Sequence, residues 1–575
     1  MRARRFQFGP AVRQGQTHFS LWAPAAHSVM LEIEGREPLA MAPQTGGWHE
    51  AKAPVGAGAR YRFRLPDGTL VPDPASRFQP DDVHGPSLVT SPDAYGWQCE
   101  SWRGRPWQEA VIYELHAGLL GGYRAIATRL PALAEIGITA IELMPIAEFS
   151  GNRNWGYDGV LPFAPEGAYG TPGELKALID EAHALGLMVF LDVVYNHFGP
   201  DGNWLHAYAP AFFREDLHTP WGAGIDFRRE EVRRFFIENA LYWLGEFRFD
   251  GLRLDAVHAI SEPDWIDEMA DEVRTAFPGR HIHLILENEH NVAEHMRRAI
   301  DAQWNDDFHN VMHVLLTGET HAYYQDFAAD PAEKLARALA QGFIYQGEPS
   351  PHHNGEPRGS QSADLPPSAF VSFLQNHDQI GNRALGERLT RLTDPASLRA
   401  ATALLLLCPQ IPLIFMGDEL GSTAPFLFFT DFHGDLAEAV REGRRKEFAK
   451  FPAFSNRKRR DKIPDPNAPS TFDACRPDFS AANDWRGFYR NLLALRHRHI
   501  VPTLAETRSI GAQVLSDRAV AARWRLNAAQ TLTLGCNLGD HPIAMTDMPF
   551  EAPIWGEAEN GAVPPKSTLA WISQA

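Results

Sequence analysis

The chain has 575 residues, of which 44% are apolar and 22% are charged, and its formal net charge is -18. This composition is typical of a folded protein of about two to four domains and argues against extensive disorder. The negative charge argues against nucleic acid or an anionic membrane surface as a partner and suits a neutral ligand.

The cysteines and the N-terminus indicate the cellular compartment. The four cysteines lie far apart and do not have the spacing of a metal site. The basic residues 1–5 are not followed by an apolar signal core, and no apolar run approaches the length that crosses a membrane. We therefore expect a soluble cytoplasmic protein with reduced thiols and with neither a metal nor a cofactor.

Residues 1–97 have the pattern of an all-β unit. The segments His18–Trp22, Val29–Ile33 and Tyr61–Leu65 largely alternate apolar and polar residues, and Gly- and Pro-rich turns separate them. Short alternating segments of this kind predict a small N-terminal β-sandwich.

From residue 98 to about residue 505, apolar strands alternate with helices. Such a pattern indicates a parallel sheet covered by helices. No Gly-rich dinucleotide fingerprint follows the first strand, which favours a (β/α)8 TIM barrel over a doubly wound sheet. The strand at 302–304 has the weakest pattern. The predicted strands are 111–116, 138–144, 187–194, 249–258, 281–286, 302–304, 370–374 and 411–415, and the predicted helices are 125–136, 175–185, 231–247, 265–277, 398–407 and 485–497.

The last part of the chain, residues 506–575, turns β again. Alternating residues in Val520–Trp524 and Thr531–Leu534 predict a small C-terminal β-sandwich. Residues 349–367, which are rich in Pro, Gly, His and Ser, are expected to form a long loop of the barrel rather than a domain boundary.

Polar side chains follow five of the predicted barrel strands. Barrel enzymes place their chemistry at the C-terminal ends of the strands, so these side chains predict an active site at one rim. No zinc spacing, phosphate loop or Ser-His-Asp signature accompanies them. A pocket rich in carboxylates suits glycoside cleavage, which uses one ionised carboxylate and one protonated carboxylic acid. The residues are Glu114, His116, Asp192, Asn196, His197, Arg253, Asp255, Glu287, Asn376, His377 and Asp378.

Two of these acids have distinct surroundings in the sequence. Arg253 and Asp255 lie two residues apart and therefore share one face of their strand. The guanidinium favours the ionised form of Asp255, as a nucleophile requires; the alternative is a structural ion pair. Glu287 follows the largely apolar run 282–286, and partial burial there would favour its protonated form.

Four stretches together resemble the signature regions of glycoside hydrolase family 13, the α-amylase superfamily, and they occur in the same order. The segment Trp155–Asp158 resembles the family's segment after the second barrel strand. Residues 1–97 resemble the carbohydrate-binding N-terminal domain of its isoamylase-like and branching members. The four stretches are Asp192–His197, Gly251–Asp255, Glu287 at a strand end, and Asn376–Asp378.

Further stretches resemble the members of this family that release trehalose from maltooligosyltrehalose. They are Trp304–His309, Gln375–Arg383, Pro425–Asp431 and Glu442–Phe448. The chain departs from that subfamily in three places. The loop Ala117–Gly122 is short, Glu289 adds a second acid near Glu287, and Leu420 stands where an aromatic residue is usual.

The resemblance implies roles for individual residues. Asp255 would be the nucleophile, Glu287 the general acid and base, with Glu289 as the alternative, and Asp378 would stabilise the transition state. Asp192 and Asn196 would orient the rim. The substrate-binding residues would be Tyr157, His197, Arg253, His258, Asp306, Asp307, His309, His377, Gln379 and Asn382.

The function that the resemblance implies is retaining hydrolysis of a trehalose-capped α-glucan. The enzyme would cleave the α-1,4 bond next to the terminal α,α-1,1-linked glucose and release trehalose and a maltooligosaccharide. A synthase that makes this substrate would be its metabolic partner. The alternatives are a glucan branching or debranching enzyme on the same barrel and a catalytically inactive glucan-binding protein.

Overall fold

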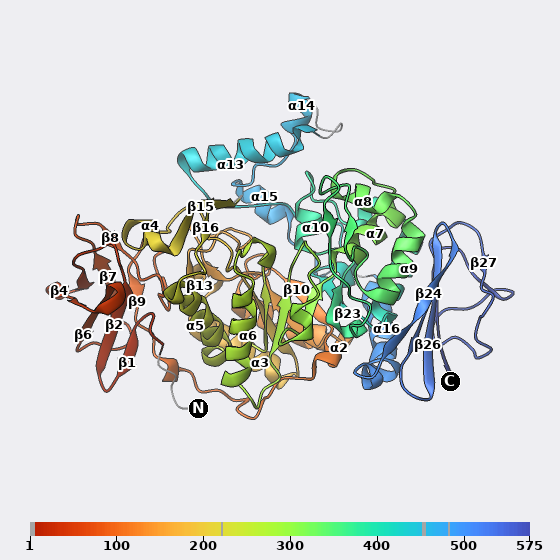
Figure 1. Cartoon of the computed structure of the whole chain (residues 1–575), viewed down its shortest axis with the longest axis horizontal. Coiled ribbons are helices and arrows are strands. Elements are labelled where there is room, and N and C mark those ends of the chain that lie inside the picture. Colours follow the sequence, from red (N-terminus) through yellow and green to blue (C-terminus); the bar gives the residue numbers. More distant parts are fainter. Residues whose placement is uncertain (1–5, 220–221, 451–455, 481–482, 575) are drawn as a thin grey trace.

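The structure, a computed structural model, describes residues 6–219, 222–450, 456–480 and 483–574. Its three parts form a row, with the N-terminal sheets at one end, the barrel in the middle and the C-terminal sheet at the other end (Figure 1). In the described part of the chain, no helix has both the length and the apolar character needed to cross a membrane.

The middle part is a closed barrel of parallel strands in sequence order, which confirms the predicted fold. Every predicted strand is present, including the weak one at 302–304. Its three residues are buried and pair with both neighbouring strands, so tertiary pairing compensates for its short apolar pattern. The barrel strands are β10 (Ile112–Leu115), β11 (Ala140–Leu143), β14 (Met188–Val193), β17 (Gly251–Leu254), β18 (His283–Leu286), β19 (Ala302–Trp304), β22 (Phe370–Ser372) and β23 (Ile411–Phe415).

Helices surround the barrel close to the predicted positions. One prediction was wrong in detail: the helix expected over 125–136 is two short helices, α1 (Tyr123–Ala127) and α2 (Leu130–Ile136). Pro131 lies at the start of α2 and has no N–H to donate to the preceding turn, so a continuous helix is disfavoured. The other long helices are α3 (Pro172–Ala184), α5 (Glu230–Glu246), α6 (Asp264–Ala276), α7 (Asp306–Thr317), α9 (Pro331–Gln341), α12 (Pro395–Leu407), α13 (Gly434–Glu447) and α16 (Trp485–His499).

Short elements lie in the connections between barrel strands and helices. The connection 349–367 is a long barrel loop, as predicted, and it begins with a two-stranded hairpin. The short helices are α4 (Leu205–Tyr208), η8 (Ala322–Tyr324), α8 (Gln325–Ala328), α10 (His377–Gly381), α11 (Leu389–Leu392), α14 (Arg457–Arg460) and α15 (Pro469–Ala474), and the hairpins are β12 (Ala147–Glu148) with β13 (Leu161–Pro165), β15 (Phe213–Thr219) with β16 (Gly222–Ile225), and β20 (Glu348–Pro349) with β21 (Pro357–Arg358).

The N-terminal part consists of two antiparallel sheets with a shared apolar core. Phe19 of one sheet packs against Tyr61 of the other, with ring centroids 4.7 Å apart. This part is joined to the barrel by Phe8, whose ring meets Phe235 of α5 edge to face. The sheets are β1 (Ala11–Arg13), β2 (Gln16–Trp22), β6 (Trp48–Ala53) and β5 (Ala42–Pro43), and β4 (Leu39–Ala40), β3 (Met30–Ile33), β7 (Arg60–Arg64) and β8 (Leu70–Val71), with β9 (Ser87–Leu88) beside β7.

The C-terminal part is a four-stranded antiparallel sheet covered by a two-stranded one. Met545 and Val563 pack on Leu569 and Trp571 of the larger sheet and form a small core between the two. The strands are β24 (Arg508–Ser516), β25 (Ala519–Arg525), β26 (Gln530–Asn537) and β29 (Ser567–Gln574), and β27 (Ile543–Ala544) with β28 (Ala562–Val563).

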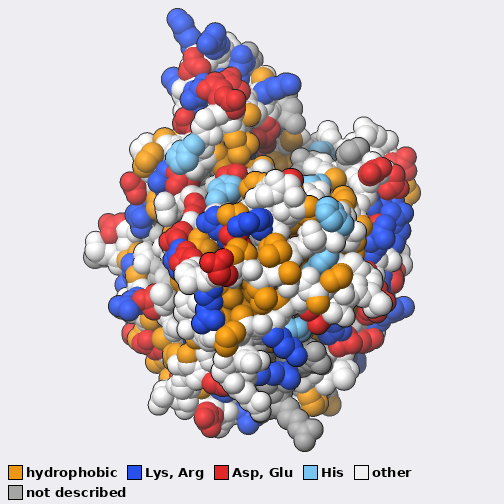
Figure 2. Space-filling view, turned by 90° about the vertical axis from the view of Figure 1, so that its left-hand side faces the viewer, with side chains coloured by type: hydrophobic (Ala, Val, Ile, Leu, Met, Phe, Trp, Pro, Cys, Tyr) orange, Lys and Arg blue, Asp and Glu red, His pale blue; other side chains and the backbone are white. Residues whose placement is uncertain are grey.

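One helical segment stands away from this compact arrangement. Helix α13 and the short helix α14 project beyond the C-terminal rim of the barrel (Figure 1). In the view turned by 90° they form a protrusion that carries many basic and acidic side chains (Figure 2). No residue of α13, all of which the structure describes, is fully buried.

Candidate active site

The guanidinium of Arg253 is the centre of the polar network at the rim. β17 places it inside the barrel, where Nη1 donates to both carboxylate oxygens of Asp192 at 2.9 and 2.8 Å. The same Nη1 donates to Oδ1 of Asp255 at 2.8 Å. The indole ring of Trp304 covers the guanidinium at 4.0 Å. Burial raises the pKa of Asp192 to about 6, although the charge of this buried guanidinium opposes the shift.

Asp255 is held in place by two neighbouring side chains. Besides the bond from Arg253, its Oδ2 accepts a hydrogen bond from Nδ2 of Asn196 at 2.9 Å. The same amide nitrogen donates to the backbone carbonyl of Asp255 at 2.8 Å. The side chain of Asp255 is 11% exposed, so these contacts orient it while part of it stays accessible.

The turn after Asp255 donates a backbone hydrogen bond to the second acid, Glu287. Ala256 has a φ of 39°, a left-handed conformation that is uncommon for a residue with a Cβ. In this turn the N–H of Ala256 donates to Oε2 of Glu287 at 2.6 Å. Oε2 of Glu287 lies 3.7 Å from Nη2 of Arg253. Asp255 and Glu287 therefore flank the same guanidinium.

Glu287 has an environment that favours its protonated form. Its side chain is 15% exposed, at the end of β18. Burial raises the pKa of Glu287 well above its usual value, the Arg253 guanidinium opposes this shift, and the charges of Asp255, Asp306 and Asp378 raise it further. A protonated carboxylic acid beside a carboxylate that accepts bonds from Arg253 and Asn196 is the combination that glycoside cleavage requires.

His377, Tyr157 and His197 form one wall of the site. Glu114 accepts a hydrogen bond from the ring Nδ1 of His377 and another from its backbone N–H, the latter at 3.2 Å. Burial lowers the pKa of His377, but the charges of Asp378 and Glu114 outweigh it and raise the pKa to about 9. At neutral pH the ring of His377 is therefore an imidazolium.

The ring of Tyr157 stacks on His377 with centroids 5.1 Å apart. Its hydroxyl donates to Oδ2 of Asp192 at 2.5 Å, and its backbone carbonyl accepts a bond from Nε2 of His197 at 2.9 Å. Burial lowers the pKa of His197, which favours the neutral ring. Three of the predicted substrate-binding residues are thus joined directly to the acid network.

Asp378 is the most exposed of the three predicted catalytic acids, with 40% of its side chain accessible. It lies in the first turn of α10, whose N-cap, Asn376, accepts a bond from the N–H of Gln379 at 3.0 Å. Its Oδ1 has two long contacts, 3.3 Å to Nδ2 of Asn382 and 3.5 Å to Nε2 of His377. The position of Asp378 therefore depends mainly on the helix that carries it.

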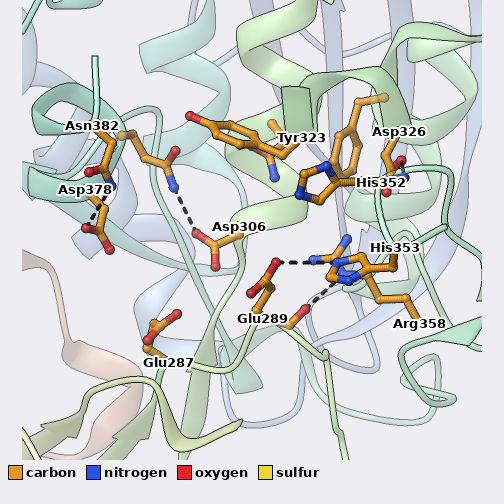
Figure 3. A pocket seen from close by; sticks show the side chains of 13 residues that line it. Glu287, Glu289, Asp306, Tyr323, Asp326, His352, His353, Arg358, Asp378 and Asn382 are labelled. Carbon is orange, nitrogen blue, oxygen red and sulfur yellow. Dashed lines mark hydrogen bonds and ion pairs between the residues drawn. The ribbon is translucent and has the colours of Figure 1, made fainter. Parts of the chain in front are cut away.

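A cleft with about 730 Å³ of empty space, partly open to solvent, extends from Glu287 and Asp378 (Figure 3). Asp306, Gln379 and Asn382, three of the predicted substrate-binding residues, line it, and Nε2 of Gln379 donates to Oδ1 of Asp306 at 3.1 Å. Burial and the charge of Asp378 raise the pKa of Asp306 to about 7.

Much of the cleft wall was not predicted. It comes from α7, from the segment of η8 and α8, and from the loop between β20 and β21, which lie far from the signature motifs in the sequence. The features of the sequence that could have indicated this part of the cleft wall were the length of the loop 349–367 and its His residues. Besides Glu289, the unpredicted lining residues are Asn310, Tyr323, Asp326, Phe327, His352, His353 and Arg358.

Asp307 and His309 do not reach this cleft. Asp307 is fully buried and accepts bonds from Nη1 of Arg358 at 2.8 Å and from the N–H of Ile344 at 2.8 Å. His309 is buried and donates from Nδ1 to the carbonyl of Leu374 at 2.5 Å. Successive residues of a helix point about 100° apart, so α7 turns Asp306 to the cleft and these neighbours behind its wall.

His258 lies beside Glu289. Its Nδ1 accepts a hydrogen bond from the N–H of Glu289 at 3.4 Å, and its Nε2 lies 3.8 Å from the carboxylate of Glu289. Burial lowers the pKa of His258. This places His258 next to the alternative acid rather than among the residues that line the cleft.

Replacing Asp307 tests whether it supports the fold. Asp307→Ala removes the carboxylate to which the buried Arg358 donates, so we expect a loss of about 3–5 kcal/mol in the free energy of unfolding. Asp306→Asn, one position earlier on α7, is the control and is expected to cost about 1 kcal/mol or less. Urea unfolding of both variants measures the difference. Equal stability of the two variants would show that Asp307 is not a scaffold residue.

Within the described ranges, no group of three or more His, Cys, Asp or Glu side chains is arranged to hold a metal ion. A parallel barrel whose C-terminal rim carries such a carboxylate network is the architecture of an α-amylase-type glycoside hydrolase. The family model described as the catalytic domain of alpha amylase matches residues 91–211 and 217–485. A model for a domain of unknown function matches residues 507–571.

Relatives that match over nearly the full length of the chain identify the group within this class of glycoside hydrolases to which the chain belongs. The chain is 40% identical to the malto-oligosyltrehalose trehalohydrolase of Deinococcus radiodurans, over 93% of this chain and 90% of the relative. It is 39% identical to that of Saccharolobus solfataricus, over 86% of this chain and 87% of the relative. The chain belongs to the malto-oligosyltrehalose trehalohydrolases of the α-amylase family.

A solved structure agrees with this assignment at the level of the fold. The crystal structure of a candidate alpha amylase from Salmonella typhimurium superposes with a TM-score of 0.94 at 45% sequence identity. The match covers 99% of this chain and 100% of that one. Pullulanase structures at about 20% identity share the fold alone, for example the enzyme of Paenibacillus barengoltzii with a TM-score of 0.71.

Proposed function

We propose that this chain is a retaining hydrolase of maltooligosyltrehalose. It cleaves the α-1,4-glucosidic bond next to the terminal α,α-1,1-linked trehalose and releases trehalose and a shortened maltooligosaccharide. The observation that carries the chemistry is that one buried guanidinium, Arg253, binds Asp255 at 2.8 Å and lies 3.7 Å from Glu287. The substrate follows from the names of the full-length relatives.

The reaction has two steps in this proposal. Asp255 attacks the anomeric carbon and forms a glycosyl ester, while Glu287 gives its proton to the oxygen of the leaving sugar. Glu287, now a carboxylate, then takes a proton from water, whose oxygen attacks the anomeric carbon and releases Asp255. Two inversions retain the α-configuration. The shared contact with Arg253 keeps the two carboxyls close together, as a retaining enzyme requires.

The surrounding residues bind the sugar and stabilise the transition state. Asp378, which lines the cleft, stabilises the positive charge that develops on the glucose ring in the transition state. Tyr157, stacked on His377, offers an aromatic surface to the sugar, and the imidazolium of His377 donates to a hydroxyl. His197 completes this wall. Asp306, Gln379 and Asn382 bind sugar hydroxyls along the cleft.

The substrate requires a preceding reaction of defined chemistry. An α-1,4-glucan carries the 1,1-linked glucose only after its reducing end has been rearranged. We therefore propose a maltooligosyltrehalose synthase as the metabolic partner of this chain. We also propose a cytoplasmic location for this chain. Free α-glucan and trehalose carry no charge, which suits a protein of net charge -18.

The second candidate function, glucan branching, has weaker support. A 1,4-alpha-glucan branching enzyme of Rhodospirillum rubrum is 33% identical over 306 residues, which is 41% of its length. The trehalohydrolases match over more than twice that share of their own length. A debranching activity is supported only by the similarity in fold to pullulanases.

A side-by-side product assay tests the assignment. We expect free trehalose from maltotriosyltrehalose, and a rate at least about ten times lower on a plain maltooligosaccharide of equal length, because the cleft would recognise the 1,1-linked end. Chromatography of both reactions measures the products. Comparable cleavage of both substrates would contradict trehalose specificity, and new α-1,6 linkages would instead support branching.

A further inference from the structure

We propose that Arg444, on the projecting helix α13, is a positioning residue for α10, the short helix that carries Asp378. This inference rests on the proposed role of Asp378 in catalysis. It assigns a task to the projecting helix α13, which belongs to neither the barrel nor the cleft lining (Figure 1).

Arg444 is the point at which α13 is bound to the helix that carries Asp378. Its Nη2 donates to the carbonyl of Gly381 at 2.6 Å and to the carbonyl of Arg383 at 3.3 Å. Nη1 donates to Glu447 at 3.0 Å within α13. The side chain of Arg444 is 9% exposed, although the rest of α13 is largely solvated. Such burial of a cation is costly unless its donors are used.

One of the two carbonyls that Arg444 binds, that of Gly381, is the last of α10 and is among those a helix leaves unpaired at its C-terminal end, whereas Arg383 lies just beyond the helix. α10 has five residues, His377–Gly381, so its last carbonyls find few partners within the helix. A cationic side chain at the C-terminal end of a helix satisfies such carbonyls and interacts favourably with the helix dipole. Arg444 thus supplies from α13 a cap that α10 does not contain.

A tight aromatic contact holds the same end of α10 from the other side. A Cβ added at Gly381 would lie 2.1 Å from the indole of Trp155, so the helix and the ring are in direct contact. Phe428 meets Trp155 edge to face at 5.2 Å, and the guanidinium of Arg444 lies 5.5 Å from the centre of Phe428. Trp155 also meets His377 edge to face at 5.6 Å. Arg444 therefore completes a packed cluster of Trp155 and Phe428 around α10.

This arrangement matters because Asp378 has little direct support. Its contacts to Asn382 and His377 are long, at 3.3 and 3.5 Å, and 40% of its side chain is exposed. The N-terminal end of α10 is fixed by Glu114 through His377. If the C-terminal end were released, the helix could tilt about that point and move the carboxylate. Displacements of about 1 Å at a catalytic group cost on the order of 100-fold in rate.

The test compares Arg444→Ala with Arg445→Ala, the adjacent residue of the same helix, whose Nη1 binds Glu442 at the surface. We expect Arg444→Ala to lower kcat on maltotriosyltrehalose about 10-fold or more, with KM within about 2-fold, because transition-state alignment is lost rather than ground-state binding. Arg445→Ala is expected to behave as wild type. Arg444→Lys retains one donor to the carbonyls and is expected to fall between the two.

A double-variant cycle separates positioning from a general loss of stability. If Arg444 acts through Asp378, then Arg444→Ala added to Asp378→Asn causes no further loss of kcat. The inference would be overturned if the two losses of kcat multiplied in the double variant. It would also be overturned if Arg444→Ala were as active as Arg445→Ala. If Arg444→Ala does not fold, Arg444→Lys replaces it in the comparison with Arg445→Ala and in the double variant with Asp378→Asn. Normal activity of Asp378→Asn itself would instead overturn the proposed role of Asp378.

Discussion

Glu287→Gln is expected to lower kcat on maltotriosyltrehalose by about 1,000-fold, because glutamine cannot give a proton to the leaving oxygen. Glutamine keeps the size of the side chain and can still accept the bond that the Ala256 N–H gives to Glu287 at 2.6 Å. The fold and the thermal midpoint should therefore change little. Steady-state kinetics with the natural substrate and thermal unfolding of the purified variant measure the two effects.

A substrate with an activated leaving group isolates the role of the acid. Fluoride departs from an α-glycosyl fluoride with little protonation, so Glu287→Gln should form the glycosyl-enzyme from it at a rate much closer to wild type than on the natural substrate. Glu289→Gln is the matched control, because Glu289 is the alternative acid at the same strand end. If Glu289→Gln shows the loss and Glu287→Gln does not, the two assignments must be exchanged.

The pH dependence of kcat/KM follows from the same carboxyl. Burial raises the pKa of Glu287, so its proton is present at and well above the pH at which an exposed glutamate loses it. Activity should then fall as pH rises through this raised pKa. The charge of Asp306 contributes to the shift, so Asp306→Asn should move the basic limb to lower pH. An unmoved limb would contradict the link between the two acids.

Asp255→Asn is expected to have the largest effect of any single replacement, lowering kcat by about 10,000-fold or more, because no glycosyl ester can form. Asparagine is close in shape, and its single side-chain oxygen can still accept the hydrogen bond from Arg253, whereas its amide nitrogen cannot accept the bond that Asn196 gives to Oδ2 of Asp255. Arg253 keeps both bonds to Asp192. The protein should therefore remain folded while losing its nucleophile.

Two further measurements identify the covalent step. A 2-fluoro glycosyl fluoride should label the wild type with one sugar on the peptide that contains Asp255, as read by mass spectrometry, and should leave Asp255→Asn unlabelled. NMR of the first product formed by the wild type should show the α-anomer. A β-anomer, or labelling of Asp255→Asn, would exclude the covalent mechanism proposed for Asp255.

Several features of this protein could be predicted from local sequence alone. Apolar runs alternating with helical periodicity predicted every barrel strand, because the β/α unit buries its strands on both faces. The stretches Asp192–His197 and Gly251–Asp255 predicted the network around Arg253, because strand ends carry the residues of one rim. These signals are short in the sequence and need no long-range contact to be recognised.

Other features depend on how distant segments pack. The orientation of α7 decided that Asp306 lines the cleft while Asp307 binds Arg358 behind it. The loop between β20 and β21 contributes His352 and His353 to the cleft wall although it has no motif, and its composition does not indicate which rim of the barrel it covers.

The support of Asp378 shows the difference most clearly. Its motif was evident in the sequence, whereas the contact of Arg444 with Gly381 joins residues 63 positions apart. Sequence by itself determined the class of fold and the acids at the rim, because periodicity and strand-end chemistry are local. Tertiary structure alone decided which side chains face the cleft and what holds them, because hydrogen bonds and burial there depend on elements that meet only after the barrel has closed.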